Sequence, residues 1–206
     1  MAFRVQRLVV GVFQANCYIL FCEDSRDAVV IDPGGSGRRI LRHLKELGAR
    51  PRYIILTHGH IDHISASPFL QRKTGAEVLA HPADVRRRSI LGLIWMRLEI
   101  REITECDEIP FCGSALRVIH TPGHSPGSIS LLIDDVLFSG DLLFAGGVGR
   151  WDLPRGNFKE LSLSLRERLK NLPDSLRVLP GHGPETTLGQ ERKTNPIFNP
   201  QFSGTY

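Results

Sequence analysis

The sequence has little that would place the protein in a membrane or outside the cell. Its 206 residues contain no apolar run of the roughly 18 to 20 residues that a membrane-spanning helix requires. Arg4 and Arg7 near the N-terminus are not followed by the apolar region and small-residue cleavage site of an export signal. We therefore expect a cytoplasmic protein with no membrane partner.

Cysteines are also few, and no two of them form a C-x-x-C pair. The four are Cys17, Cys22, Cys106 and Cys112. Their spacing argues against a zinc knuckle and against a thioredoxin-like redox site. Because disulfides are rare in proteins that are not exported, we expect reduced and mostly buried thiols.

Concentrated positive charge, repeats and low-complexity segments are absent as well. The net charge is +4 and the pI about 9.1, but the basic residues are scattered, and the run at 86–88 is typical of a solvated face. We therefore expect no nucleic-acid partner. Hydrophobic residues at 41% and charged residues at 23% are ordinary for a globular protein, and the length predicts a single domain over residues 1–206.

The apolar pattern predicts strands alternating with helices, and several consecutive strands joined as hairpins. Asn157 is placed to cap a helix with Glu160 three residues on, and Gly48 and Gly75 are placed to end helices. These elements predict an α+β fold, with two mixed β-sheets covered by helices on their outer faces in a four-layer αββα sandwich. The expected strands are 3–10, 15–22, 28–31, 53–56, 77–80, 116–120, 128–133, 136–139 and 177–179, and the expected helices are 40–47, 62–73 and 157–169.

The strongest chemical signal is the loop that follows the predicted strand 53–56. Within six residues it carries His58, His60, Asp62 and His63. A divalent metal needs several fixed nitrogen or oxygen donors at about 2 Å. On an extended loop alternate side chains point the same way, so His58 and His60 can hold one ion, while Asp62 and His63 can turn towards a second.

One loop cannot complete two coordination shells, and three further donors follow other predicted strands. His124 and His182 lie in glycine-rich turns, and Asp141 ends a buried strand, where an unpaired carboxylate would be costly without a metal. Each alone is ambiguous between a ligand and an ordinary packed or capping residue. Together they repeat one pattern, a strand followed by a glycine-rich turn and a metal-type donor.

This H-x-H-x-D-H string with the later donors in order resembles the metallo-β-lactamase-fold superfamily over nearly the whole chain. The resemblance implies that Asp32, in Ile31-Asp32-Pro33-Gly34-Gly35, steadies the histidine loop from behind the ligands. It also implies two divalent metal ions, with zinc the first choice and iron or manganese acceptable to the same donors. The implied first site is His58, His60 and His124, the second is Asp62, His63 and His182, and Asp141 bridges the two.

The resemblance implies hydrolysis through a hydroxide shared between the ions, because two ions about 3.5 to 4 Å apart lower the pKa of a shared water towards 7. We assign Asp62 and Asp141 a part in this catalysis. Residues 146–156 and 181–196 look like short bacterial glyoxalase II-like hydrolases, which implies a small-molecule thioester such as S-lactoylglutathione as substrate. Arg150 is a candidate to steer an anionic thiol carrier, or else forms a structural ion pair.

The chain departs from classical glyoxalase II, since little sequence follows His182 where that family has a C-terminal helical domain. The absence of that domain bears on specificity for glutathione and not on the general thioester chemistry. Other interpretations are a persulfide dioxygenase with one iron at His58, His124 and Asp141, another hydrolase of the fold such as a lactonase or phosphodiesterase, and a purely structural metal site. The apolar stretch 90–98 suggests a flap or a dimer contact, and we expect a monomer or homodimer.

Overall fold

The first of two sheets holds the N-terminal half of the chain in sequence order. The computed structural model describes residues 3–85 and 97–199. The strands of the first sheet are β1 (Phe3–Val10), β2 (Ala15–Cys22), β3 (Asp27–Ile31), β4 (Arg50–Leu56), β5 (Glu77–Ala80) and β6 (Ile100–Glu102). A hairpin joins β1 to β2, and β2 pairs antiparallel with both β1 and β3. From β3 to β6 the strands run parallel, because helices connect most of them.

The second sheet holds the C-terminal half, in the order β14-β13-β10-β9-β8-β7. Its only parallel pair among the described strands is β10 with β13. Its strands are β7 (Glu108–Phe111), β8 (Ser114–His120), β9 (Ile129–Ile133), β10 (Val136–Gly140), β13 (Arg177–Pro180) and β14 (Thr186–Thr187), with a small separate hairpin of β11 (Leu143–Phe144) and β12 (Gly147–Val148).

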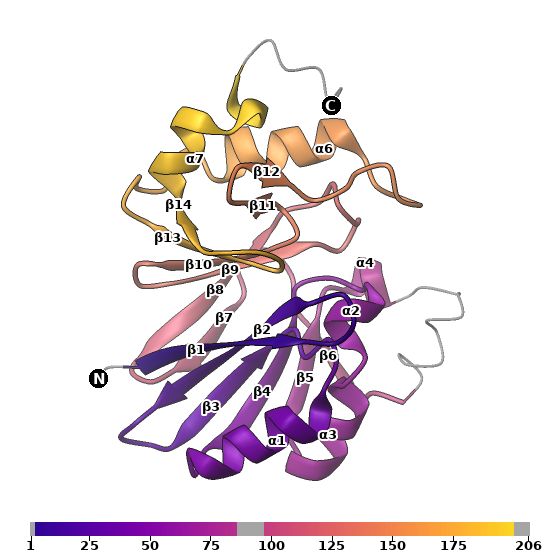
Figure 1. The fold of residues 1–206 in the computed structure, drawn as a ribbon, viewed down its shortest axis with the longest axis vertical. Coiled ribbons are helices and arrows are strands. Elements are labelled where there is room, and N and C mark those ends of the chain that lie inside the picture. Colours follow the sequence, from indigo (N-terminus) through magenta and orange to yellow (C-terminus); the bar gives the residue numbers. More distant parts are fainter. Residues whose placement is uncertain (1–2, 86–96, 200–206) are drawn as a thin grey trace.

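Helices cover the outer face of each sheet (Figure 1), as the sequence predicts. One apolar cluster lies between the sheets, a second lies under α1 (Gly37–Glu46) and α3 (Ser67–Thr74), and a third lies under α6 (Phe158–Leu163) and α7 (Leu188–Thr194). The chain continues from α6 as a π-helix over Ser164–Arg168. The four-layer αββα sandwich is therefore confirmed.

The single helix predicted for 62–73 is wrong, because the chain forms two helices there. A short α2 (Ile61–Ile64) ends before Ala66, and α3 begins at Ser67. Pro68 explains the break: a proline lacks the N–H that a helix interior needs, but it fits the first turn of a new helix. Gly75 ends α3 with a φ of 71°, and the Asn157 side chain caps α6 by accepting from the Glu160 N–H, both as predicted.

The expectation of four reduced cysteines is also wrong. Cys22, at the end of β2, forms a disulfide with Cys112, in the turn between β7 and β8, while Cys17 is free and buried and Cys106 is free and exposed. The partners are 90 residues apart in sequence, and only the packing of one sheet on the other brings them together.

Residues 90–96 of the predicted flap or dimer contact lie outside the described residues, and Leu98 packs against the apolar cluster beneath α1 and α3. Within 3–85 and 97–199, no helix combines the length and apolar character needed to cross a membrane.

The carboxyl ends of the parallel strands meet at one edge of the sandwich. There the Asn16 N–H donates to the Gly181 carbonyl at 2.7 Å and the Ile129 N–H donates to the Thr57 carbonyl at 2.8 Å, so each bond joins a strand of one sheet to a segment that follows a strand of the other. Because side chains that follow strand ends project beyond the sheets, this edge gathers the polar residues that the sequence singled out.

Candidate metal centre

The histidine loop leaves the end of β4 and is held from beneath by Asp32, which follows the neighbouring parallel strand β3. Asp32 Oδ1 accepts the Thr57 N–H at 2.7 Å, and Oδ2 accepts the Thr57 hydroxyl at 2.6 Å. Asp32 Oδ2 also lies 2.9 Å from His63 Nδ1. One buried carboxylate therefore grips the loop at its start and at its last histidine, the position that the resemblance implied for Asp32.

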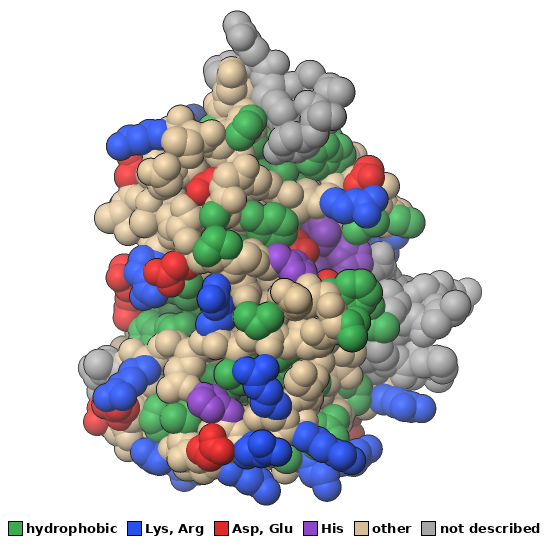
Figure 2. All heavy atoms as spheres, viewed as in Figure 1, with side chains coloured by type: hydrophobic (Ala, Val, Ile, Leu, Met, Phe, Trp, Pro, Cys, Tyr) green, Lys and Arg blue, Asp and Glu red, His purple; other side chains and the backbone are tan. Residues whose placement is uncertain are grey.

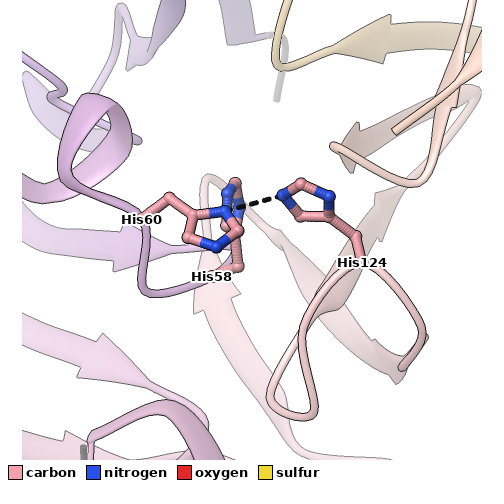
Figure 3. Close-up of side chains that lie close together, drawn as sticks. All are labelled: His58, His60 and His124. Carbon is pink, nitrogen blue, oxygen red and sulfur yellow. Dashed lines mark hydrogen bonds between the residues drawn. The ribbon is translucent and has the colours of Figure 1, made fainter. Parts of the chain in front are cut away.

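A first group of donors consists of His58, His60 and His124, whose rings converge in Figure 3. His60 Nδ1 lies 2.7 Å from His124 Nε2, and one ligand atom from each residue falls within 4.8 Å of the others. His124 Nδ1 donates to the Arg150 carbonyl at 2.7 Å. A carbonyl can only accept, so this bond places the proton on Nδ1 and leaves Nε2 unprotonated, with its lone pair turned towards the other two histidines.

A second group consists of Asp62, His63 and His182, again with ligand atoms within 4.8 Å of one another. Asp62 Oδ2 lies 3.2 Å from His182 Nε2 and 3.8 Å from His63 Nε2. The turn that carries His182 is held by Asn16, whose Nδ2 donates to the Pro180 and Gly183 carbonyls at 2.9 Å each.

Asp141 stands between the two groups. Its Oδ1 lies 3.4 Å from His63 Nε2 in the second group, and its Oδ2 lies 3.5 Å from His124 Nε2 in the first. Gly149 and Gly181 allow this close approach: a Cβ on Gly149 would lie 1.8 Å from the Asp141 carbonyl oxygen, and a Cβ on Gly181 would lie 2.2 Å from Asp141 Oδ1. The geometry matches a carboxylate that is shared between two ions.

Burial and the mutual charges shift the titration of the cluster. Burial lowers the pKa of His58 well below its ordinary value, and the neighbouring imidazoles add to this. Burial also opposes the charged form of His63, but Asp141, Asp32 and Asp62 outweigh it and raise the pKa of His63 to about 9. Burial likewise acts to raise the pKa of Asp62, yet the hydrogen bond from His182 and the charge of His63 hold it at about 2. Asp62 therefore remains a carboxylate at neutral pH, as a metal ligand must.

Two atoms of the centre test whether these residues suit a metal. His58 Nε2 and Asp141 Oδ1 are buried, and neither has a hydrogen-bond partner within the described part of the chain. Buried polar atoms without partners are costly, and a divalent cation that accepts nitrogen and oxygen donors would satisfy both. The donors also reach the surface, since the histidine side chains gather with acidic ones in the seam between the two halves in Figure 2. The residues therefore fit a metal.

The side chain of Arg150, which the sequence singled out, and three further histidines are not among the two groups of donors. The Arg150 guanidinium makes two hydrogen bonds to the exposed Asp152 carboxylate, at 2.9 and 2.8 Å, so the structure shows the ion-pair alternative for its side chain. The rings of His81 and His120 stack on each other at 4.2 Å, and His43 lies on α1. Substrate binding by Arg150 stays a prediction.

Sequence reasoning missed residues that hold the ligands without being donors. Asn16 is the polar residue in the otherwise apolar strand β2, and that contrast was a usable signal. Asp84 follows β5 closely, much as Asp32 follows β3, and its carboxylate accepts the Gly59 N–H inside the histidine loop at 2.7 Å. The Arg150 carbonyl had no such signal, because every residue has one.

The chain is similar to known proteins over almost its full length. The model of the metallo-beta-lactamase superfamily matches residues 10–182. A hydroxyacylglutathione hydrolase, GloC, of Haemophilus influenzae is 34% identical over 95% of this chain and 98% of that protein. The probable metallo-hydrolase YqgX of Bacillus subtilis is 39% identical over 94% of this chain and 97% of that protein.

Solved structures agree with this likeness. BLEG-1 B3 metallo-beta-lactamase superposes with a TM-score of 0.84 at 33% identity, covering 95% of this chain and 100% of that one. TTHA1623 in a di-iron-bound form gives 0.81 at 37%, covering 93% and 99%, and ETHE1 from Myxococcus xanthus gives 0.81 at 30%, covering 99% and 93%. The family fold implies binding of divalent metal, and the names of the relatives support a metal-dependent hydrolase. The chain belongs to the metallo-beta-lactamase superfamily.

Proposed function

We propose that the protein is a two-metal hydrolase that cleaves thioesters in the manner of glyoxalase II, releasing an acid and a thiol. S-lactoylglutathione and related hydroxyacyl thioesters are the first substrates to test. The observation that carries the two-metal part is the position of Asp141 between two groups of donors, with its buried Oδ1 free of any hydrogen-bond partner in the described structure. The thioester part is supported by the similarity to the GloC hydrolase over nearly the whole chain.

In this proposal His58, His60 and His124 would hold one ion, Asp62, His63 and His182 would hold the other, and Asp141 would be shared by both. The bound ions would supply an activated water and stabilise the negative charge that develops on the substrate carbonyl. The chain's own residues keep this arrangement rigid. Asp32 fixes the His63 ring, and the Arg150 carbonyl fixes the tautomer of His124, so that each imidazole presents the correct nitrogen.

Exposed apolar side chains lie near the proposed centre. Ile61 lies between two donors in sequence and is 43% exposed. Val12 and Phe13, at 89% and 63% exposed, lie in the β1–β2 turn. That turn packs on the Asp32–Gly35 segment, because a Cβ on Gly11 would meet the Gly34 carbonyl oxygen at 3.2 Å. Apolar side chains beside a charged centre favour a substrate with an apolar portion.

The decisive experiment joins metal quantitation to a substrate panel. The zinc-loaded protein is assayed for thiol release from S-lactoylglutathione and a generic thioester, beside a lactone, a β-lactam, a phosphodiester and glutathione persulfide. We expect two metal ions per chain and thioester hydrolysis that His60→Ala and Asp141→Ala abolish. His43→Ala is the matched control, since this histidine lies on α1 away from the donors.

Three outcomes would contradict the proposal. One iron per chain with oxygen consumption on the persulfide would indicate a dioxygenase. Turnover of the lactone or phosphodiester without the thioesters would indicate another hydrolase of the fold. Two tightly bound ions without turnover of any substrate would indicate a structural site.

A further inference from the structure

Asp84 is a buried carboxylate that is not one of the seven proposed metal ligands. It lies in α4 (Pro82–Val85), just beyond the end of β5, and its exposed fraction is 1%. A buried carboxylate without partners is costly, so the hydrogen-bond partners of Asp84 indicate its structural role.

Asp84 joins two loops that are distant in sequence. Its Oδ2 accepts the Gly59 N–H at 2.7 Å and the Ser125 hydroxyl at 2.6 Å, and its Oδ1 accepts the Gly127 N–H at 3.0 Å. All three groups donate, which suits the two acceptor oxygens of a carboxylate. Gly127 makes the contact sterically possible, because a Cβ there would lie 2.7 Å from Asp84 Cγ.

These two loops carry the whole first group of donors. Gly59 lies between His58 and His60, and Ser125 directly follows His124. The distance between the loops therefore sets whether three imidazoles can face one ion. Asp32, in contrast, contacts the histidine loop at Thr57 and at His63, a donor of the second group.

We propose that Asp84 is a positioning residue for the first metal site, an inference that rests on the proposed two-metal function. By accepting hydrogen bonds from both loops, it holds His58 and His60 at a fixed distance from His124. An asparagine at this position keeps the shape but turns an N–H₂ towards one of the donors, so at least one hydrogen bond is lost and a buried N–H or O–H is left without a partner.

The expected consequence is specific to one of the two ions. Loss of a group that orients metal ligands typically lowers metal affinity about 10- to 100-fold. Asp84→Asn should therefore weaken binding of the first ion by about that factor and leave the second ion, held by Asp62, His63 and His182, within about twofold of wild type. Ser125→Ala removes only one of the three bonds and should have a smaller effect in the same direction.

Glu191 provides a matched control elsewhere in the fold. It is also a buried carboxylate, 2% exposed, and it also accepts three hydrogen bonds. Its donors are the Gly146 N–H at 2.9 Å, the Thr186 hydroxyl at 2.7 Å and the Asn195 side-chain amide at 2.8 Å, none of which adjoins a proposed ligand. Glu191→Gln should lower stability as Asp84→Asn does, but leave both metal affinities unchanged.

The test is a cobalt(II) titration of the chelator-treated full-length protein, followed by visible absorbance and by competition with a chelator of known affinity. His58→Ala identifies which of the two binding events belongs to the first site. Thermal unfolding of the metal-free variants separates a general loss of stability from a loss of metal affinity. Selective weakening of the first event in Asp84→Asn, with Glu191→Gln as wild type, supports the positioning role.

The outcomes also separate this inference from the proposed function. If wild type takes up no cobalt, both are overturned. If wild type takes up two ions and Asp84→Asn binds the first equally tightly, the positioning role alone is refuted. The positioning role is also refuted if Glu191→Gln weakens metal binding as much as Asp84→Asn does. It is refuted as well if Asp84→Asn fails to fold and Ser125→Ala folds but binds the first ion as tightly as wild type.

Discussion

Replacement of Gly181 by alanine should remove the metal centre while sparing the fold. A Cβ at this position would lie 2.2 Å from Asp141 Oδ1 and 2.7 Å from His63 Cε1, whereas ordinary contacts begin at 3.4 Å. To relieve the shorter contact the carboxylate must move away by about 1.2 Å, which is the difference between 2.2 and 3.4 Å. The shared ligand and a ligand of the second ion are therefore displaced together.

The size of the effect follows from that displacement. A misplacement of about 1 Å in a catalytic arrangement can cost on the order of 100-fold in rate, which corresponds to about 2.7 kcal/mol of transition-state stabilisation. We expect thioester hydrolysis by Gly181→Ala to fall by at least that factor and its metal content to fall from two ions towards one or none. The assay is kcat/KM for S-lactoylglutathione together with metal analysis of the same sample.

Gly183→Ala is the control for backbone effects in the same turn. Gly183 has a φ of 77°, so alanine is strained there by about 1 to 2 kcal/mol, but a Cβ would meet nothing within 4 Å. This variant should lose some thermal stability and keep two ions. The reasoning is refuted if Gly181→Ala binds two ions with wild-type affinity, or if both variants lose metal equally.

Three further predictions concern residues that hold either the fold or the histidine loop in place. The disulfide between Cys22 and Cys112 closes a loop of 90 residues, so Cys112→Ser should lower the free energy of unfolding by up to about 4.6 kcal/mol, measured by chemical denaturation. Wild type in reductant should lose the same stability as this variant. If reductant leaves the stability of wild type unchanged, the disulfide does not form. Asp32→Ala should lower metal affinity about 10- to 100-fold in chelator competition, and an unchanged affinity would show that the loop holds itself. Asn157→Ala should lower stability by about 1 kcal/mol, seen as a lower Tm at unchanged activity, whereas an unchanged Tm would mean that the cap contributes nothing.

Much of the fold could be predicted because its signals are local. Alternating and continuous apolar runs predicted strands at 15–22 and 136–139, where the structure has Ala15–Cys22 and Val136–Gly140, and Asn157 and Gly75 marked helix ends. The break between α2 and α3 also had a local signal in Pro68, so that error was avoidable. The short edge strand Ile100–Glu102 was missed because three residues carry too little pattern to stand out.

The donors could be predicted for a different reason. Histidine and aspartate are the residues that metals require, and the spacing of His58, His60, Asp62 and His63 is compressed into one loop. Their supports are harder to find, because a support is defined by what it contacts. Asp84 reaches Gly59 from 25 residues away and Ser125 from 41, and the Arg150 carbonyl reaches His124 from 26.

By itself, then, the sequence determined the kinds of donor atoms, their order along the chain and the strand-and-helix pattern that carries them. Only the tertiary structure decided at what distances Asp141 lies from the two groups, that Cys22 meets Cys112, and that Asp84 and Asp32 contact different residues of the histidine loop. The physical reason is range: propensity and periodicity act over a few residues. The position of a buried carboxylate depends on which donors the packed sheets bring within about 3 Å of it.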